Sequence, residues 1–265
     1  PEAQVDLTDM IIRWFDYWLK ELENGVDEAP QVRYFVMGSG QWKQADTWPA
    51  PGMEDKDYFL DSTGTAGIDG AADIDGTGVL RQTSPEQDSS DAYDYDPNDP
   101  VPTLWDQSLF TVPTDRRALE YRQDILYYRT EPLTDEVEVV GYPRVVLHVA
   151  SSAPDTDFFA RLVDEDPEGT AIDVCYGMVR ARHRHGLDSE DFLTPDEVTE
   201  FEIKLGATAC RFQTGHRIRL EITSSDFPNH DRNHNTGKND LTDTELVPAH
   251  QRIMHGPQYP SRLVL

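Results

Sequence analysis

The stretch that decides the fold is "HRIRLEITSS", residues 216–225. Its apolar residues Ile218, Leu220 and Ile222 alternate with polar or charged ones, the period-two pattern of a β-strand with one face in a core and the other in water. The run "EFEIKLG", residues 200–206, repeats this pattern. Similar short runs, punctuated by Gly, Pro, Asn and Asp, follow one another with no helical stretch between them. The sequence therefore predicts an all-β domain over residues 31–265, an antiparallel sandwich or jelly roll.

One segment departs from the strand pattern. Between residues 5 and 22 the apolar residues recur every three to four positions, which predicts an amphipathic helix; they are Ile11, Trp14, Phe15, Trp18, Leu19 and Leu22. Asn24-Gly25 and Pro30 end the helical pattern. An all-strand domain offers only part of the surface that such a helix must bury. We therefore expect residues 1–25 to belong to a preceding domain.

The charge is strongly acidic, with 50 Asp and Glu against 23 Lys and Arg and a net charge of -27. This balance repels phosphate backbones and anionic lipid surfaces, so we expect neither a nucleic-acid partner nor a membrane partner. Most of the basic residues are Arg, and carboxylates are spread through the whole chain. Such a composition is typical of proteins adapted to concentrated salt, which screens the self-repulsion.

The ends of the sequence bear on localisation. No run of about 18 apolar residues and no secretory signal pattern occurs. The first residue is Pro and not Met, which predicts a fragment or a processed chain. Localisation stays open on this basis, with the cytoplasm favoured over secretion.

Several constellations invite a functional interpretation. In "FPNHDRNHNTG", residues 227–237, His230 and His234 have the spacing of metal ligands on a helix, but Pro228 and Gly237 bracket the segment and favour a loop, so no metal site is predicted. The acidic loop 71–82 lacks the first and last calcium ligands of an EF-hand. No G-x-S-x-G nucleophile motif occurs.

Two further groups have structural interpretations. In "RARHRH", residues 180–185, a strand would place three guanidinium groups on one face, where pairing with nearby carboxylates is favoured over anion binding. Cys175 and Cys210 are too few for a disulfide framework or a cysteine zinc site. Two buried thiols are expected, with one strand-to-strand disulfide left open.

Four separated segments carry a family resemblance. "VRYFVMGSGQW", "YDPNDPVPTL", "SAPDTDFFARLVDEDPEGTAIDVCYGMVRARHR" and "GHRIRLEITSSDFPNHDRNHNTG" together resemble the C-terminal jelly-roll domain, a galactose-binding-like β-sandwich, of the X-Pro dipeptidyl-peptidase and cocaine esterase (CocE/NonD) family of serine hydrolases. The segment "IIRWFDYWLKELENGVDEAP" is similar to the last helix of that family's α/β-hydrolase domain.

The resemblance implies an accessory role. Its partners would be the catalytic domain and helical cap of the same parent chain, and the Ser-His-Asp triad would lie outside residues 1–265, so that this chain alone holds no catalytic residue and is inactive. It further implies that Leu109 and Phe110 contribute to the substrate pocket for the acyl group. It implies an ordered structural loop through Asp231, Arg232, Asn233, Asn235 and Gly237, a pattern to which His230 and His234 do not belong. No cofactor is expected.

Two alternatives remain at this level. A stand-alone carbohydrate-binding module would use Trp42, Trp48 and Trp105 to stack on sugars. Metal-dependent catalysis would use His230 and His234. Whether a parent enzyme acts on esters or X-Pro peptides, and its oligomeric state, cannot be read from the sequence.

Overall fold

The computed structural model describes residues 3–64, 66, 78–104 and 114–265. Strands dominate this part of the chain, and the all-β prediction is confirmed. The elements are α1 (Leu7–Lys20), β1 (Val32–Val36), β2 (Gln41–Ala45), β3 (Asp57–Asp61), β4 (Gly78–Arg81), β5 (Ser89–Tyr95), η2 (Arg116–Leu119), β6 (Leu126–Arg129), β7 (Val137–Gly141), β8 (Arg144–Ser151), β9 (Asp157–Glu165), β10 (Ala171–Arg180), η3 (Ala181–His183), β11 (Thr199–Lys204), β12 (Thr208–Phe212), β13 (Arg217–Thr223), β14 (Ala249–His255) and β15 (Arg262–Val264).

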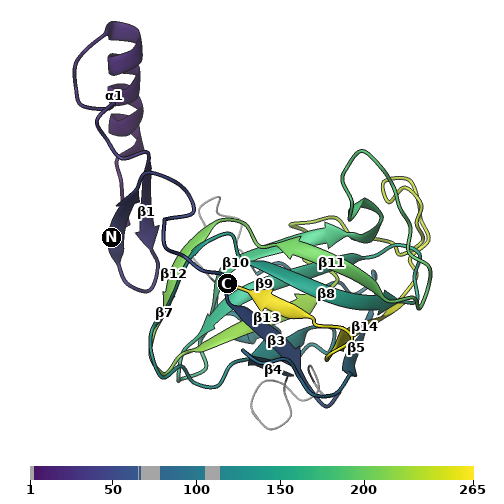
Figure 1. Ribbon diagram of the computed structural model, residues 1–265. Helices are drawn as coiled ribbons and strands as arrows, with labels where there is room; N and C mark the ends of the chain where they lie inside the picture. The colour runs from purple at the N-terminus through teal and green to yellow at the C-terminus, as the bar shows by residue number, and fades with distance from the viewer. Residues whose placement is uncertain (1–2, 65, 67–77, 105–113) are drawn as a thin grey trace.

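One large sheet forms the body of the molecule (Figure 1). Its strands pair in the order β10-β9-β13-β6-β4-β3-β15-β8-β14-β5, and β11 pairs with the other edge of β8. Among the described residues, its strands pair antiparallel except for β4 with β6. The sheet folds back on itself, so that the β9 and β13 layer faces the β8 and β11 layer.

The core lies between these two layers. Ile218, Leu220 and Ile222 of β13 are fully buried in it, as the alternation in this stretch predicts. Across the sandwich, the rings of Phe158 on β9 and Phe201 on β11 meet edge to face with centroids 5.2 Å apart. Because both layers direct alternate side chains inward, aromatic and branched residues from distant segments fill one continuous core.

The outer face of β13 is buried, whereas the sequence pattern predicts that it is exposed to solvent. β11 has the predicted exposed polar face, with Glu200, Glu202 and Lys204 in solvent. On β13, by contrast, Arg219 is 0% exposed and Glu221 is 2% exposed. Residues 116–120, which include η2, lie against this face and supply ion-pair partners, so a polar alternation does not here mean a solvent-exposed surface.

The helix α1 stands apart from the sandwich, next to the β1–β2 hairpin (Figure 1). It begins where the Asp6 side chain caps the Asp9 N–H at 2.9 Å. It ends at Lys20, and the C-cap residue Glu21 adopts a left-handed conformation, ahead of the expected stop at Asn24-Gly25. No residue of α1 is buried. The hairpin contacts the sandwich through the Lys43–Glu138 ion pair and a bridge between Met37 and Cys210.

Candidate functional site

The loop after β13 holds the densest polar network expected from the sequence. Residues 228–248 contain neither helix nor strand. Asn233 is 1% exposed, and its Nδ2 donates to Asp155 Oδ2 at 2.8 Å and to Asp157 Oδ1 at 2.9 Å. Asn235, with a positive φ of 64°, donates through Nδ2 to the Val247 carbonyl oxygen at 2.7 Å. The two amides thus tie the loop to the start of β9 and to the segment before β14.

The other three loop residues lie against neighbouring segments of the chain. Arg232 donates to the Pro97 carbonyl oxygen at 2.9 Å, and its guanidinium lies over the Phe227 ring. Asp231 contacts Arg180 at 3.3 Å. Gly237 has a φ of 70°, and a Cβ there would come within 3.2 Å of the Phe192 ring. Four of the five residues thus make polar contacts, and the fifth, Gly237, has a positive φ that favours glycine.

Ion pairs surround this loop. Arg180 forms two hydrogen bonds of 2.8 Å with Asp157, and Arg182 lies 3.0 Å from Asp240. Burial raises the pKa of Asp157, against the opposing effect of Arg180 and Asn233. The carboxylate pairing expected for the "RARHRH" run is present, but the strand ends at Arg180 and a short 3₁₀ helix, η3, follows it.

The two loop histidines, His230 and His234, have different contacts. The His230 ring meets the rings of Phe159 and Tyr176, with centroids 5.1 Å and 6.1 Å apart. His234 is held through its backbone N–H, which donates to Asp240 Oδ1 at 3.0 Å. Within the described part of the chain, no group of three His, Cys, Asp or Glu side chains is arranged to hold a metal ion.

A group with the composition of a catalytic triad lies on the outside of β8. His148 Nε2 is 3.1 Å from Glu200 Oε2, and His148 Nδ1 is 3.5 Å from Ser261 Oγ. The serine, however, is 1% exposed and donates its proton to the Met254 carbonyl oxygen at 2.6 Å. It also accepts the His148 backbone N–H at 2.9 Å. A hydroxyl engaged in this way is not an activated nucleophile, because its proton does not point to the base.

The proposed pocket residues Leu109 and Phe110 lie outside the described residues, as do Trp105 and most of the loop 71–82. The flanks of that segment are described. Thr103 Oγ1 donates to Asp226 Oδ1 at 2.9 Å on one side, and Arg116 Nε donates to Glu221 Oε2 at 2.6 Å on the other. Both flanks are therefore attached to β13 or to the residues directly after it.

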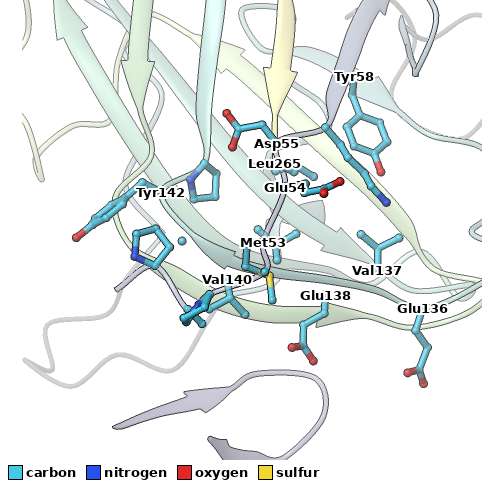
Figure 2. A pocket seen from close by; sticks show the side chains of 18 residues that line it. Met53, Glu54, Asp55, Tyr58, Glu136, Val137, Glu138, Val140, Tyr142 and Leu265 are labelled. Atoms are coloured by element: carbon cyan, nitrogen blue, oxygen red, sulfur yellow. The ribbon is translucent and has the colours of Figure 1, made fainter. Parts of the chain in front are cut away.

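An open groove of about 620 Å³ lies between β7 and the segment that leads into β3 (Figure 2). Met53, Val140 and Tyr142 give it an apolar part, and Glu54 and Asp55 also line it. Met53 and Tyr142 are 45% and 57% exposed. Asp55 pairs with Arg144 at 2.7 Å.

The tryptophans expected to stack on sugars have other partners. The Trp42 ring contacts Phe35 and carries the Arg33 guanidinium at 4.5 Å from its centroid. Trp48 packs edge to face against Tyr34 and Tyr142. Both rings are half-buried in these contacts.

The two cysteines are free thiols, and no disulfide joins them. Cys175 lies on β10 and Cys210 on β12. Burial raises the pKa of each thiol to about 12. Thiols that stay protonated in this way are structural and unreactive.

No helix among the described residues is long and apolar enough to cross a membrane.

Comparisons with known proteins give this geometry a context. The chain is 40% identical over 268 residues to the cocaine esterase of Rhodococcus sp. (strain MB1 Bresler), covering 98% of this chain and 46% of that protein. Among solved structures, an aminopeptidase from a marine sediment Thaumarchaeota archaeon matches with a TM-score of 0.80 at 26% identity, over 97% of this chain and 43% of the other. An α-amino acid ester hydrolase matches with a TM-score of 0.81 at 26% identity, over 96% and 43%.

The chain thus spans less than half the length of these relatives. The family model of the X-Pro dipeptidyl-peptidase C-terminal non-catalytic domain matches residues 24–264, nearly the whole β-sandwich. The match includes the ordered loop and both layers of the sheet. On this evidence the chain belongs to the family of X-Pro dipeptidyl-peptidase C-terminal non-catalytic domains, which also occur in hydrolases of the cocaine esterase type.

Proposed function

We propose that this chain is the accessory β-sandwich of a serine hydrolase that cleaves acyl esters or X-Pro peptides. In this proposal it packs on the α/β-hydrolase domain of the same parent protein and helps to shape the substrate cleft. Catalysis itself belongs to the hydrolase domain. The proposal is supported by the family membership and by one structural observation, the uncovered apolar face of α1.

Nine large apolar side chains of and beside α1 lie in solvent, each 49–73% exposed: Leu7, Met10, Ile11, Ile12, Trp14, Phe15, Trp18, Leu19 and Leu22. The rings of Trp14 and Trp18 contact each other, with centroids 5.8 Å apart, and touch no part of the core. A contiguous apolar surface of this kind marks a place where another protein surface packs. The similarity of this helix to the last helix of a hydrolase domain supplies the partner.

The contribution to the cleft rests on Leu109 and Phe110. Apolar side chains at these positions suit contact with the acyl group of a substrate, as the family resemblance implies. The tethering of both flanks of this segment to β13 supports the proposal, because a pocket wall needs a rigid base.

The first test asks whether the catalytic activity resides in this chain or in the hydrolase domain. The chain alone and the complete hydrolase are assayed with p-nitrophenyl acetate and with Gly-Pro-p-nitroanilide. We expect turnover only from the complete hydrolase. Turnover by the chain alone that a serine-directed inhibitor abolishes would refute the proposal.

The second test examines packing by α1. Hydrogen exchange of the amides in residues 7–20 is compared between the chain alone and the complete hydrolase. A helix with no buried residue opens readily in isolation, so we expect strong protection to arise only in the complete protein. W14S/W18S should reduce that protection, and D16N, on the same helix but outside the apolar set, should not. Equal exchange in both proteins would contradict the packing.

A further inference from the structure

The strand β7 has one unpaired edge. Among the described residues it pairs only with β12, and the two strands form a sheet of their own. The other edge of β12 contacts Met37, whose N–H donates to the Ala209 carbonyl oxygen at 2.9 Å and whose carbonyl oxygen accepts the Arg211 N–H at 2.8 Å. The small sheet is therefore extended on the β12 side and open on the β7 side.

The bonds of Met37 also determine which backbone groups of β7 face outward. In a strand the N–H and C=O of one residue point to the same side, and successive residues alternate. Since the residues on either side of Cys210 point to Met37, Cys210 itself points to β7, where it lies opposite Val139. Val139 therefore bonds to β12, and its neighbours Glu138 and Val140 direct their N–H and C=O groups away from β12.

The groove of about 620 Å³ runs along this unpaired edge (Figure 2). Every residue from 136 to 143 lines it, and residues 49–56 form the opposite wall. Because successive side chains point to opposite faces of a strand, a groove that touches all of them follows the backbone edge and not one face. The five residues of β7 give this edge a length of about 17 Å.

An apolar cluster joins the groove to the β1–β2 hairpin. Val140, which lines the groove, packs with Val36 of β1 in one buried cluster. Trp48 packs edge to face against both Tyr34 of β1 and Tyr142 of the groove, with ring centroids 5.3 Å and 6.3 Å apart. The groove therefore adjoins the hairpin that follows α1, the helix with the uncovered apolar face.

Charge and shape narrow the choice of occupant. Among the described residues that line the groove, four are acidic and one is basic: Glu54, Asp55, Glu136, Glu138 and Lys56. A second copy of this chain would bring the same carboxylates and a net charge of -27 against the edge, which disfavours pairing between copies. The opposite wall also favours a lone extended segment over the edge of a folded sheet.

We propose that the edge of β7 binds an extended segment of the hydrolase domain of the parent protein. The segment adds a strand to the β12–β7 sheet through main-chain hydrogen bonds to Glu138 and Val140, and it carries an apolar residue toward Met53 and a Lys or Arg toward Glu54. This inference rests on the proposed function. The hydrolase domain is the partner because the groove adjoins the hairpin that connects to α1, whose apolar face the same domain covers in the proposed function.

Site-resolved hydrogen exchange in β7 tests the pairing. Exchange rates are compared between the chain alone and the complete hydrolase. The amides of Val137, Val139 and Gly141 bond to β12 and should be protected in both proteins, which makes them internal controls. The amides of Glu138 and Val140 should exchange at least about tenfold more slowly in the complete hydrolase. Equal exchange of these two amides in both proteins would overturn the inference.

V140P removes one outward N–H and leaves the bonds of β7 to β12 in place, because Pro is tolerated where the N–H of a strand points away from the sheet. V140A is the matched control, since it shortens the same side chain and keeps the N–H. In the complete hydrolase V140P should return the exchange of the Glu138 amide to the rate of the chain alone, and V140A should leave it slow. If both variants behave alike, strand pairing does not protect this edge and the inference is wrong. If V140P does not fold, the exchange pattern of the unmodified protein decides.

A photo-cross-linker identifies the occupant. Tyr142, an exposed residue of the groove, is replaced by p-benzoylphenylalanine in the complete hydrolase. We expect a cross-link within one molecule to a segment of the hydrolase domain that contains Lys or Arg. A cross-link between two copies, or one confined to residues 1–265, would show that the partner is wrong.

The failure of the inference and that of the proposed function are distinguishable. If the amides of α1 gain protection in the complete hydrolase and those of Glu138 and Val140 do not, only the pairing at β7 fails. If α1 gains no protection and the complete protein turns over neither p-nitrophenyl acetate nor Gly-Pro-p-nitroanilide, the proposed function itself fails.

Discussion

Arg219 provides the sharpest test of the charged cluster beneath η2. Its side chain is 0% exposed and contacts three carboxylates, Glu120 at 2.6 Å, Glu221 at 2.8 Å and Glu165 at 3.2 Å. Its guanidinium also lies 4.5 Å from the centre of the Tyr127 ring. With Arg116 and Arg129, the cluster has three guanidinium groups against three carboxylates.

The substitution R219M leaves two guanidinium groups against three carboxylates. Glu221 keeps Arg116 and Glu165 keeps Arg129, so Glu120 loses its close partner and retains only Arg129 at 3.7 Å. Removing one partner of a buried ion pair costs about 3–5 kcal/mol, and we expect R219M to lower the free energy of unfolding by this amount. Adding E120Q removes the surplus charge and should recover about half of the loss.

The assay is urea unfolding followed by tryptophan fluorescence. The control is R217M, two residues earlier on β13, because Arg217 donates to the Thr130 carbonyl oxygen at 2.7 Å and its nearest carboxylate, Glu131, is 3.9 Å away and exposed. That change should cost about 1 kcal/mol. If R219M costs no more than R217M, the β5–β6 connection does not seal this face in solution and the reasoning is refuted.

Three other predictions follow from charge and burial. Because the net charge is -27, the melting temperature should rise as KCl increases from about 0.1 M toward molar concentrations; a flat or falling curve would contradict the salt adaptation. The pKa of Glu221 is lowered from its ordinary value of 4.5, so its charge contributes stability that is complete above pH 4.5 and is lost as pH falls through the lowered pKa. The difference in unfolding free energy between the unmodified protein and E221Q should therefore stay constant above pH 4.5 and shrink on acidification below it. Cys175 and Cys210, with pKa values raised to about 12, should react with a thiol reagent at mildly alkaline pH only after denaturant is added; rapid labelling of the native chain would show that the thiols are accessible.

The residue types of the candidate site can be predicted from the sequence, but the contacts between them cannot. The loop 227–237 was expected from its Pro, Asn and Gly residues, yet the pairing of Asn233 with Asp155 and Asp157 was not, because the partners lie about 80 positions away in the sequence. The group of His148, Glu200 and Ser261 was missed for the same reason. No local pattern signals it, since β8, β11 and the segment before β15 meet only in the folded sheet.

The sequence by itself determined that this is an all-β domain with one amphipathic helix, since strand and helix periodicity are local properties of the backbone and of the side chains that one face must bury. Only the tertiary structure decided which polar strand face is exposed to solvent. β11 and β13 carry the same alternation, but β13 lies beneath residues 116–120, and its charges are stabilised there by residues 54 to 105 positions away. Burial depends on what packs over a strand, and a one-dimensional pattern does not contain that information.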